Sequence, residues 1–131
     1  YDFGIHLGLA FQLQDDYLDA FGDQATFGKK IGGDILENKK TILYHLALEK
    51  ADPRQSDLLK LLLSSKQPLS DENKIIETKH LFKDTGAKEA AKLAIFHYSD
   101  LATKQLEKLA IDEKQKESFL ALKDWLMNRT Y

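Results

Sequence analysis

The chain has 131 residues, 43% of them hydrophobic, which is enough for one domain with a core of its own. Its 19 basic and 21 acidic residues are mixed along the whole length, so no basic face for nucleic acid stands out. With no cysteine, any metal site must use oxygen or histidine ligands, and the composition fits a reducing cytoplasm. No apolar run approaches the roughly 20 residues of a membrane span.

Apolar residues recur at spacings of three and four with few prolines and glycines between them, which predicts an all-α protein of about six helices. The first helix is expected over residues 3–21. Because its apolar residues point in every direction, we expect it to be buried on all sides. A glycine-rich loop should follow over residues 22–33. Asp34 and Glu37 then predict a capping box for a second helix that reaches Lys50.

The remaining helices are expected over residues 53–65, 70–86, 87–109 and from about 112 to the end. Three of them begin after a capping residue, namely Asp52, Ser70 and Asp112. The chain starts with Tyr1 inside an apolar helical pattern that has no capping signal. We therefore interpret it as a piece of a longer protein.

Three carboxylates lie near the end of the first helix, at Asp15, Asp16 and Asp19. Asp15 and Asp19 share one helix face, where like charges repel and the helix macrodipole adds partial negative charge. A divalent cation removes this conflict, and oxygen ligands without sulfur favour Mg²⁺, which normally shares its ligand shell with substrate phosphates. The pattern predicts a magnesium site for a diphosphate, with a solvated acidic helix end as the alternative.

A longer string follows these aspartates, comprising Phe21-Gly22-Asp23, Gly28-Lys29-Lys30, Gly32-Gly33-Asp34-Ile35 and Asn38-Lys39-Lys40-Thr41. Over about residues 8–46 the sequence strongly resembles the second aspartate-rich region of the trans-isoprenyl diphosphate synthases. The resemblance implies the isoprenoid synthase helical bundle, with residues 1–131 as the C-terminal portion of one polyprenyl synthase domain. The N-terminal half, with the first aspartate-rich motif, would be absent. The implied activity is a Mg²⁺-dependent prenyltransferase that joins an allylic diphosphate to isopentenyl diphosphate.

The same resemblance implies roles for individual residues. The implied metal ligands are Asp15, Asp16 and Asp19, with Asp34 in the outer shell; the implied substrate-binding residues are Gln12, Lys29 and Lys39; and Asp15, Asp16, Asp19 and Lys29 would be catalytic. A helix cap is the alternative role for Asp34. The roles of Lys30 and Lys40 stay open. The glycine-rich loop that carries Lys29 is expected to close over the site.

Two other functions remain in competition. A class I terpene cyclase shares the helical fold and ionises diphosphates, but its second metal motif uses mixed Asn, Ser or Thr and Glu ligands. A non-catalytic helical subunit that binds a synthase would lack the first motif in its intact gene. Because the first helix is apolar all round, we expect the isolated chain to be inactive and to pair with a second copy, as a homodimer, or with the missing N-terminal half.

Overall fold

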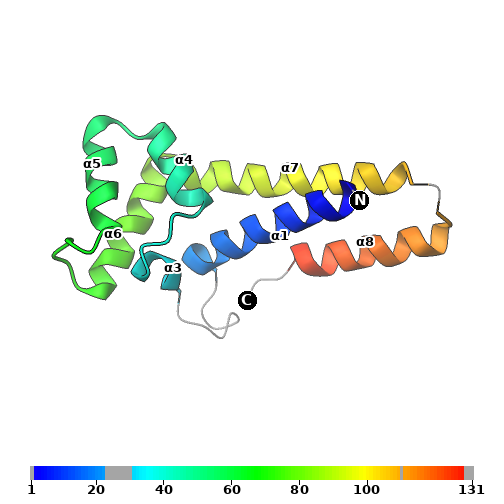
Figure 1. Ribbon diagram of the computed structural model, residues 1–131, viewed down its shortest axis with the longest axis horizontal. Coiled ribbons are helices and arrows are strands. Elements are labelled where there is room, and N and C mark those ends of the chain that lie inside the picture. Colours follow the sequence, from blue (N-terminus) through cyan, green and yellow to red (C-terminus); the bar gives the residue numbers. More distant parts are fainter. Residues whose placement is uncertain (1, 23–30, 110, 129–131) are drawn as a thin grey trace.

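The computed structural model describes residues 2–22, 31–109 and 111–128, and every regular element within these ranges is a helix (Figure 1). The helices are α1 (Asp2–Phe21), α3 (Gly33–Leu36), α4 (Ile42–Lys50), α5 (Pro53–Leu62), α6 (Asp71–Asp84), α7 (Ala87–Glu107) and α8 (Glu113–Met127). The all-α fold class predicted from the sequence is confirmed.

The three long helices α1, α7 and α8 lie side by side, and α3, α4, α5 and α6 gather at one end of the molecule (Figure 1). The closest association is between α1 and α7. On α7 the buried side chains include Ala87, Ala91 and Ala102, all fully inaccessible. Such small residues let two helix backbones approach closely. The α1–α7 pair is therefore the centre of the helix packing: α3, α4, α6 and α8 each contact α1 or α7, and α5 packs against α4 and α6.

The core is divided into two hydrophobic clusters. The larger one lies at the end where α3 to α6 gather, and Leu43, Leu59 and Phe82 are among its most buried side chains. The smaller one joins Phe3 and the N-terminal part of α1 to α7 and α8, and the ring of Phe3 meets that of Phe119 edge-on at 5.5 Å. Since α8 has no fully buried residue, it is held by partly buried contacts alone.

The prediction of a single helix over residues 34–50 is wrong, because the structure has two helices there, α3 and α4. Asn38 adopts a φ of 60°, a left-handed conformation in which an α-helix cannot continue. The expected capping box is also absent from this segment. Asp34 lies inside the first turn of α3, and the residue before that helix, Gly32, makes no side-chain capping bond. This break explains why seven helices are described where about six were expected.

The first helix is not buried on all sides within the described residues. Phe3 and Leu7 are buried, but Ile5 and Leu9 remain 44% and 43% exposed. The reason is that α7 and α8 cover one side of α1, and a Cβ atom added at Gly8 on the other side would meet nothing within 4 Å. One apolar face of α1 is thus left open in this chain.

The three predicted helix caps are confirmed. The side chains of Asp52, Ser70 and Asp112 each accept a hydrogen bond from the backbone N–H three residues on, at 2.7, 3.3 and 2.8 Å. These bonds satisfy donors that the first turn of a helix leaves unpaired. Among the helices described, none combines the length and apolar character needed to cross a bilayer.

Replacing Phe82 by alanine is expected to lower the free energy of unfolding by about 3–5 kcal/mol, because the ring is lost from the larger cluster and leaves a cavity. Phe82 is 2% exposed. Phe96→Ala is the matched control, since its ring is 72% exposed and its loss should cost less than about 0.5 kcal/mol. Urea unfolding followed by circular dichroism measures both. Equal losses in the two variants would contradict this position of the core.

Candidate functional site

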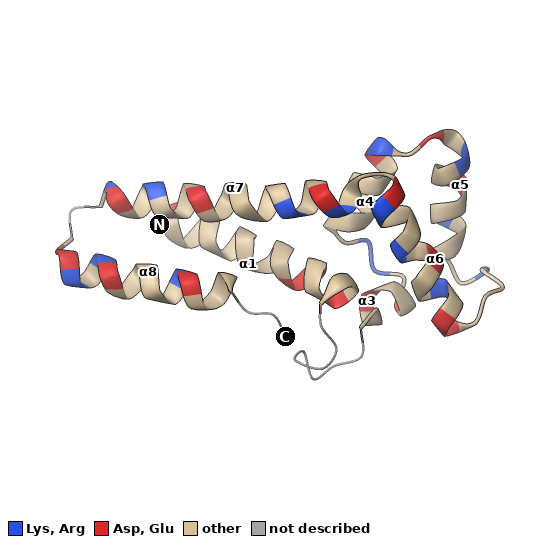
Figure 2. Cartoon of the chain, turned by 180° about the vertical axis from the view of Figure 1, so that it is seen from behind, with Lys and Arg blue, Asp and Glu red and all other residues tan. Residues whose placement is uncertain are grey.

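Five residues singled out from the sequence come together where α1 meets α3 and the turn that follows it. The Gln12 amide donates a hydrogen bond to Asp16 Oδ1 at 3.1 Å. The ammonium of Lys39 lies 3.8 Å from Asp16 Oδ1 and 3.9 Å from Asp34 Oδ2. Asp19 lies one helical turn after Asp16. Acidic segments of α1 and α3 are adjacent in Figure 2, and we call Asp16, Asp19 and Asp34 the carboxylate cluster.

The N-terminus of α3 is fixed onto the end of α1 through Asp19. The Gly32 N–H donates to the Asp19 carbonyl oxygen at 2.7 Å, and the Asp34 N–H donates to Asp19 Oδ2 at 2.9 Å. Gly32 has a φ of 93°, and a Cβ atom there would lie 2.8 Å from Ile75. Only glycine fits both the conformation and the space at this position.

The carboxylate cluster is held at an electrostatic cost. Burial raises the pKa of Asp19 above its usual range, against the opposing effects of the Asp34 N–H and the Lys39 ammonium. Burial also raises the pKa of Asp34, and the neighbouring Asp19 charge raises it further. Lys39 offsets the effects of burial and of charge repulsion only in part, because both pKa values remain raised. The cluster therefore favours an additional positive charge.

The donor chemistry of the cluster fits a hard cation. Its groups are carboxylate oxygens, which Mg²⁺ prefers. Within residues 2–22, 31–109 and 111–128, however, no three His, Cys, Asp or Glu side chains are arranged to hold a metal ion between them. A cation bound here would complete its shell with water or phosphate oxygens, as Mg²⁺ commonly does.

The other residues singled out from the sequence have separate positions. Asp15 lies on α1 immediately before Asp16, with a partly buried side chain. Lys29 and Lys30 fall outside the described residues, as does most of the loop that was expected to close the site. The Lys40 ammonium is directed away from the cluster, because it donates to the Leu63 carbonyl at 2.7 Å. Lys40 thus ties the turn to the end of α5.

One residue near the site was not found by sequence reasoning. Lys74 on α6 is 4% exposed, and its ammonium donates to Asn38 Oδ1 in the turn before Lys39. No local motif marks this lysine. The signal available in the sequence is Asn38 itself, since asparagine is one of the few residues that tolerate a left-handed conformation.

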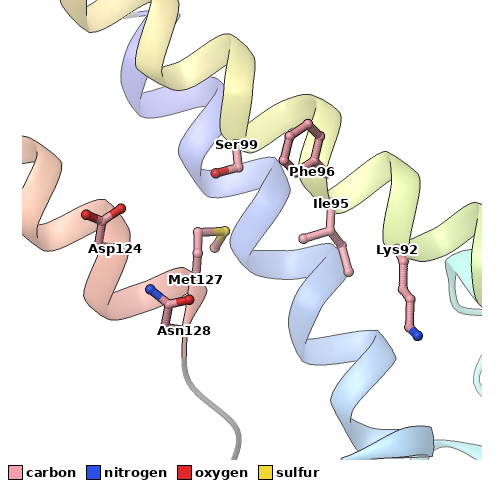
Figure 3. Close-up of a pocket in the computed structure, with 7 residues that line it drawn as sticks. All are labelled: Lys92, Ile95, Phe96, Ser99, Asp124, Met127 and Asn128. Atoms are coloured by element: carbon pink, nitrogen blue, oxygen red, sulfur yellow. The ribbon is translucent and has the colours of Figure 1, made fainter.

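A separate hollow of about 290 Å³ lies between α7 and α8 (Figure 3). Its lining residues are Lys92, Ile95, Phe96, Ser99, Asp124, Met127 and Asn128. The hollow shares no lining residue with the carboxylate cluster, so the two features are distinct parts of the structure.

The sequence profile of the polyprenyl synthetase family matches residues 1–81. The chain therefore belongs to this family, which confirms the resemblance seen over residues 8–46. It is 33% identical over 130 residues to a short chain isoprenyl diphosphate synthase of Methanothermobacter thermautotrophicus, covering 99% of this chain and 38% of that protein.

Solved structures show the same relationship. A geranylgeranyl pyrophosphate synthase crystal structure superimposes with a TM-score of 0.87 at 41% identity, over 100% of this chain and 41% of that one. A geranylgeranyl pyrophosphate synthase of Corynebacterium glutamicum, complexed with isoprenyl diphosphate and magnesium, gives a TM-score of 0.84 at 29% identity, over 98% of this chain and 36% of that one. The chain has the isoprenoid synthase helical fold and spans about two fifths of the length of these relatives.

The raised pKa of Asp34 predicts a pH dependence of stability. The folded chain binds more protons than the unfolded chain between the ordinary pKa of 3.8 and the raised value, so stability should fall as pH rises through this interval. Asp34→Asn removes the ionisation. The variant should unfold at higher urea concentration than the parent near pH 7. The difference should vanish near about pH 3, where Asp34 of the parent is protonated in both the folded and the unfolded chain.

Urea midpoints across this pH range provide the measurement. Asp57→Asn, on the exposed surface of α5, is the matched control for loss of one negative charge. An Asp34→Asn variant that is less stable than the parent at pH 7 would contradict the described electrostatics of the cluster.

Proposed function

We propose that residues 1–131 form the C-terminal portion of one polyprenyl synthase domain and bind the diphosphate of an allylic substrate. In the whole enzyme that diphosphate would leave as the allylic carbon is joined head to tail to isopentenyl diphosphate, with Mg²⁺ as cofactor. The observation that carries this proposal is the placement of the Lys39 ammonium within 4 Å of both Asp16 and Asp34, on facing elements. The Lys39 ammonium, which could bind an anion, and the carboxylates, which could bind a metal ion, thus lie at one site.

In this proposal Asp15, Asp16 and Asp19 hold Mg²⁺ directly or through water, and Asp34 lies in its outer shell. The chemistry supplied by Mg²⁺ at this position is neutralisation of negative charge on the diphosphate. The complex of a relative with isoprenyl diphosphate and magnesium supports the assignment. The Asp19 charge, which raises the pKa of Asp34, supports it too, since a cation bound at the cluster would offset this repulsion.

Three side chains of this chain, those of Gln12, Lys39 and Lys29, have distinct roles in the proposal. Gln12 holds the Asp16 carboxylate by donating a hydrogen bond to it. Lys39, whose side chain is half exposed, donates to the diphosphate oxygens and stabilises the charge that grows as the C–O bond breaks. Lys29, from the segment outside the described residues, contacts the same diphosphate. The double bond of isopentenyl diphosphate then attacks the allylic carbocation and forms the new C–C bond, and loss of a proton from the resulting carbocation restores a C=C double bond.

The open face of α1 supports a second part of the proposal. Ile5 and Leu9 are both more than 40% exposed on the helix that carries the aspartates. Exposed apolar surface of this kind favours association. We infer that this face packs against a second copy of the chain or against the N-terminal portion of the domain. The assembled enzyme would act in the cytoplasm.

Magnesium binding by the chain is expected to be weak in the absence of diphosphate and at least about tenfold tighter in its presence, because Mg²⁺ dehydrates reluctantly and needs phosphate oxygens. Calorimetric titration with MgCl₂, with and without inorganic diphosphate, measures this. Asp15→Ala and Asp19→Ala should abolish the gain, whereas Asp57→Ala on α5 should preserve it. Tight binding of Mg²⁺ alone, lost on changing Gln12 but retained in Asp15→Ala, would refute the metal assignment.

The isolated chain is expected to show no turnover with an allylic diphosphate, isopentenyl diphosphate and Mg²⁺, and to associate in solution. Product analysis and light scattering test the two expectations. Leu9→Ser should reduce association, and Leu58→Ser, at a comparably exposed leucine of α5, should not. Addition of an N-terminal portion from a relative should restore turnover, and Asp15→Ala should remove it again. Turnover by a purified monomer would contradict the need for a partner.

A further inference from the structure

The position of Lys39 depends on the turn between α3 and α4, residues 37–41. At Asn38 the backbone adopts a φ of 60°, which costs free energy for most side chains and persists only where surrounding contacts hold it. The Asn38 N–H donates to the Ile35 carbonyl at 3.0 Å, and the Lys39 N–H donates to the Asp34 carbonyl at 2.9 Å. These bonds close the end of α3 but leave the Asn38 side chain to be fixed from outside the turn.

That outside contact comes from Lys74, 36 residues further along the chain. Its side chain is 4% exposed on α6, and the ammonium donates to the neutral amide oxygen of Asn38. A lysine is rarely buried this deeply, and removal of its ammonium from water is costly. Burial accordingly lowers the pKa of Lys74, with Asp71 opposing the shift and Lys40 adding to it. Packing alone would be served better by an apolar residue of the same length.

A second contact holds the backbone of the same residue. The Lys40 ammonium donates to the Leu63 carbonyl at 2.7 Å and to the Asn38 carbonyl at 3.3 Å. The turn is therefore fixed to α6 through the Asn38 amide and to the end of α5 through Lys40. Between these two anchored positions, Lys39 is directed to the opposite side, where Asp16 and Asp34 lie.

We propose that Lys74 is a positioning residue for Lys39: by holding the Asn38 amide it maintains the left-handed turn that directs the Lys39 ammonium to the carboxylate cluster. Lys74 acts through Asn38 and has no direct part in the chemistry. The proposal rests on the proposed function for the role of Lys39 towards diphosphate. The geometric part, that Lys74 determines where Lys39 points, stands separately and can be tested separately.

The first test is a double-mutant cycle on binding of inorganic diphosphate in the presence of MgCl₂, measured by calorimetry on the whole 131-residue chain. Lys74→Met keeps the buried apolar stem and removes the ammonium. It should weaken binding about tenfold, a loss of about 1.4 kcal/mol. In a Lys39→Met background the same change should have no further effect, because no Lys39 ammonium remains to be directed. Lys74→Arg, which retains a donor, should bind within about threefold of the parent.

A purely structural role for Lys74 would give a different result. Lys74→Met would then weaken binding by the same factor in the parent and in the Lys39→Met background, and this outcome would overturn the proposal. Asn38→Gly removes the side-chain acceptor and permits the left-handed turn without fixing it, because glycine adopts negative φ values about as readily as positive ones. It should weaken binding as Lys74→Met does, and the two changes together should be no worse than either alone.

Crystal structures of Lys74→Met and Asn38→Gly give the second test, which does not depend on diphosphate. In both variants the Lys39 ammonium should leave its position near Asp16 and Asp34. If the parent chain binds no diphosphate, the proposed function fails, but these structures still show whether Lys74 determines the position of Lys39. The positioning role would be overturned if the Lys39 side chain stayed in place in both variants. If Lys74→Met did not fold, an unchanged Lys39 position in Asn38→Gly would be sufficient to overturn it.

Discussion

Two hydrogen bonds from the N-terminal edge of α3 to Asp19 hold the short helix against the end of α1. A helix of four residues has no stability of its own in water, so α3 exists because of these bonds and because Ile35 is buried in the larger cluster. The geometry of the site follows from this attachment. Asp34 is carried to the carboxylates of α1, and the turn after α3 brings Lys39 within reach of both helices.

The helices with side-chain caps could be located from the sequence because a cap is a local interaction. Asp52, Ser70 and Asp112 each bond a backbone N–H three residues away. The division between α3 and α4 could not be located in this way. Asp34 and Glu37 have the spacing of a capping box, yet the conformation is decided by Gly32 and Asn38, whose positive φ values leave no trace in the apolar periodicity.

The composition of the site was largely accessible from the sequence, but its geometry was not. The cluster of Gln12, Asp16, Asp19, Asp34 and Lys39 was expected, and the structure brings these side chains together. Lys39 and Lys40, by contrast, are neighbours of the same type that face opposite ways. Their directions are set by the turn and by Leu63, a contact 23 residues distant from Lys40. Contacts over such separations are fixed by tertiary packing and have no local sequence signal.

The division of the core into two clusters has a consequence for the dynamics of the molecule. Local opening free energies follow the number of buried apolar contacts, so backbone amides should not exchange with solvent uniformly along the chain. The helix α8 has no fully buried residue and should therefore have a low opening free energy. The Gln14 amide, which donates to the Met127 carbonyl, links it to α1. Asp19 and α3 lie at the end that holds the larger cluster. Backbone amides of α8 should therefore exchange before those of α3 and of the C-terminal end of α1, where Asp34, Asp16 and Asp19 lie.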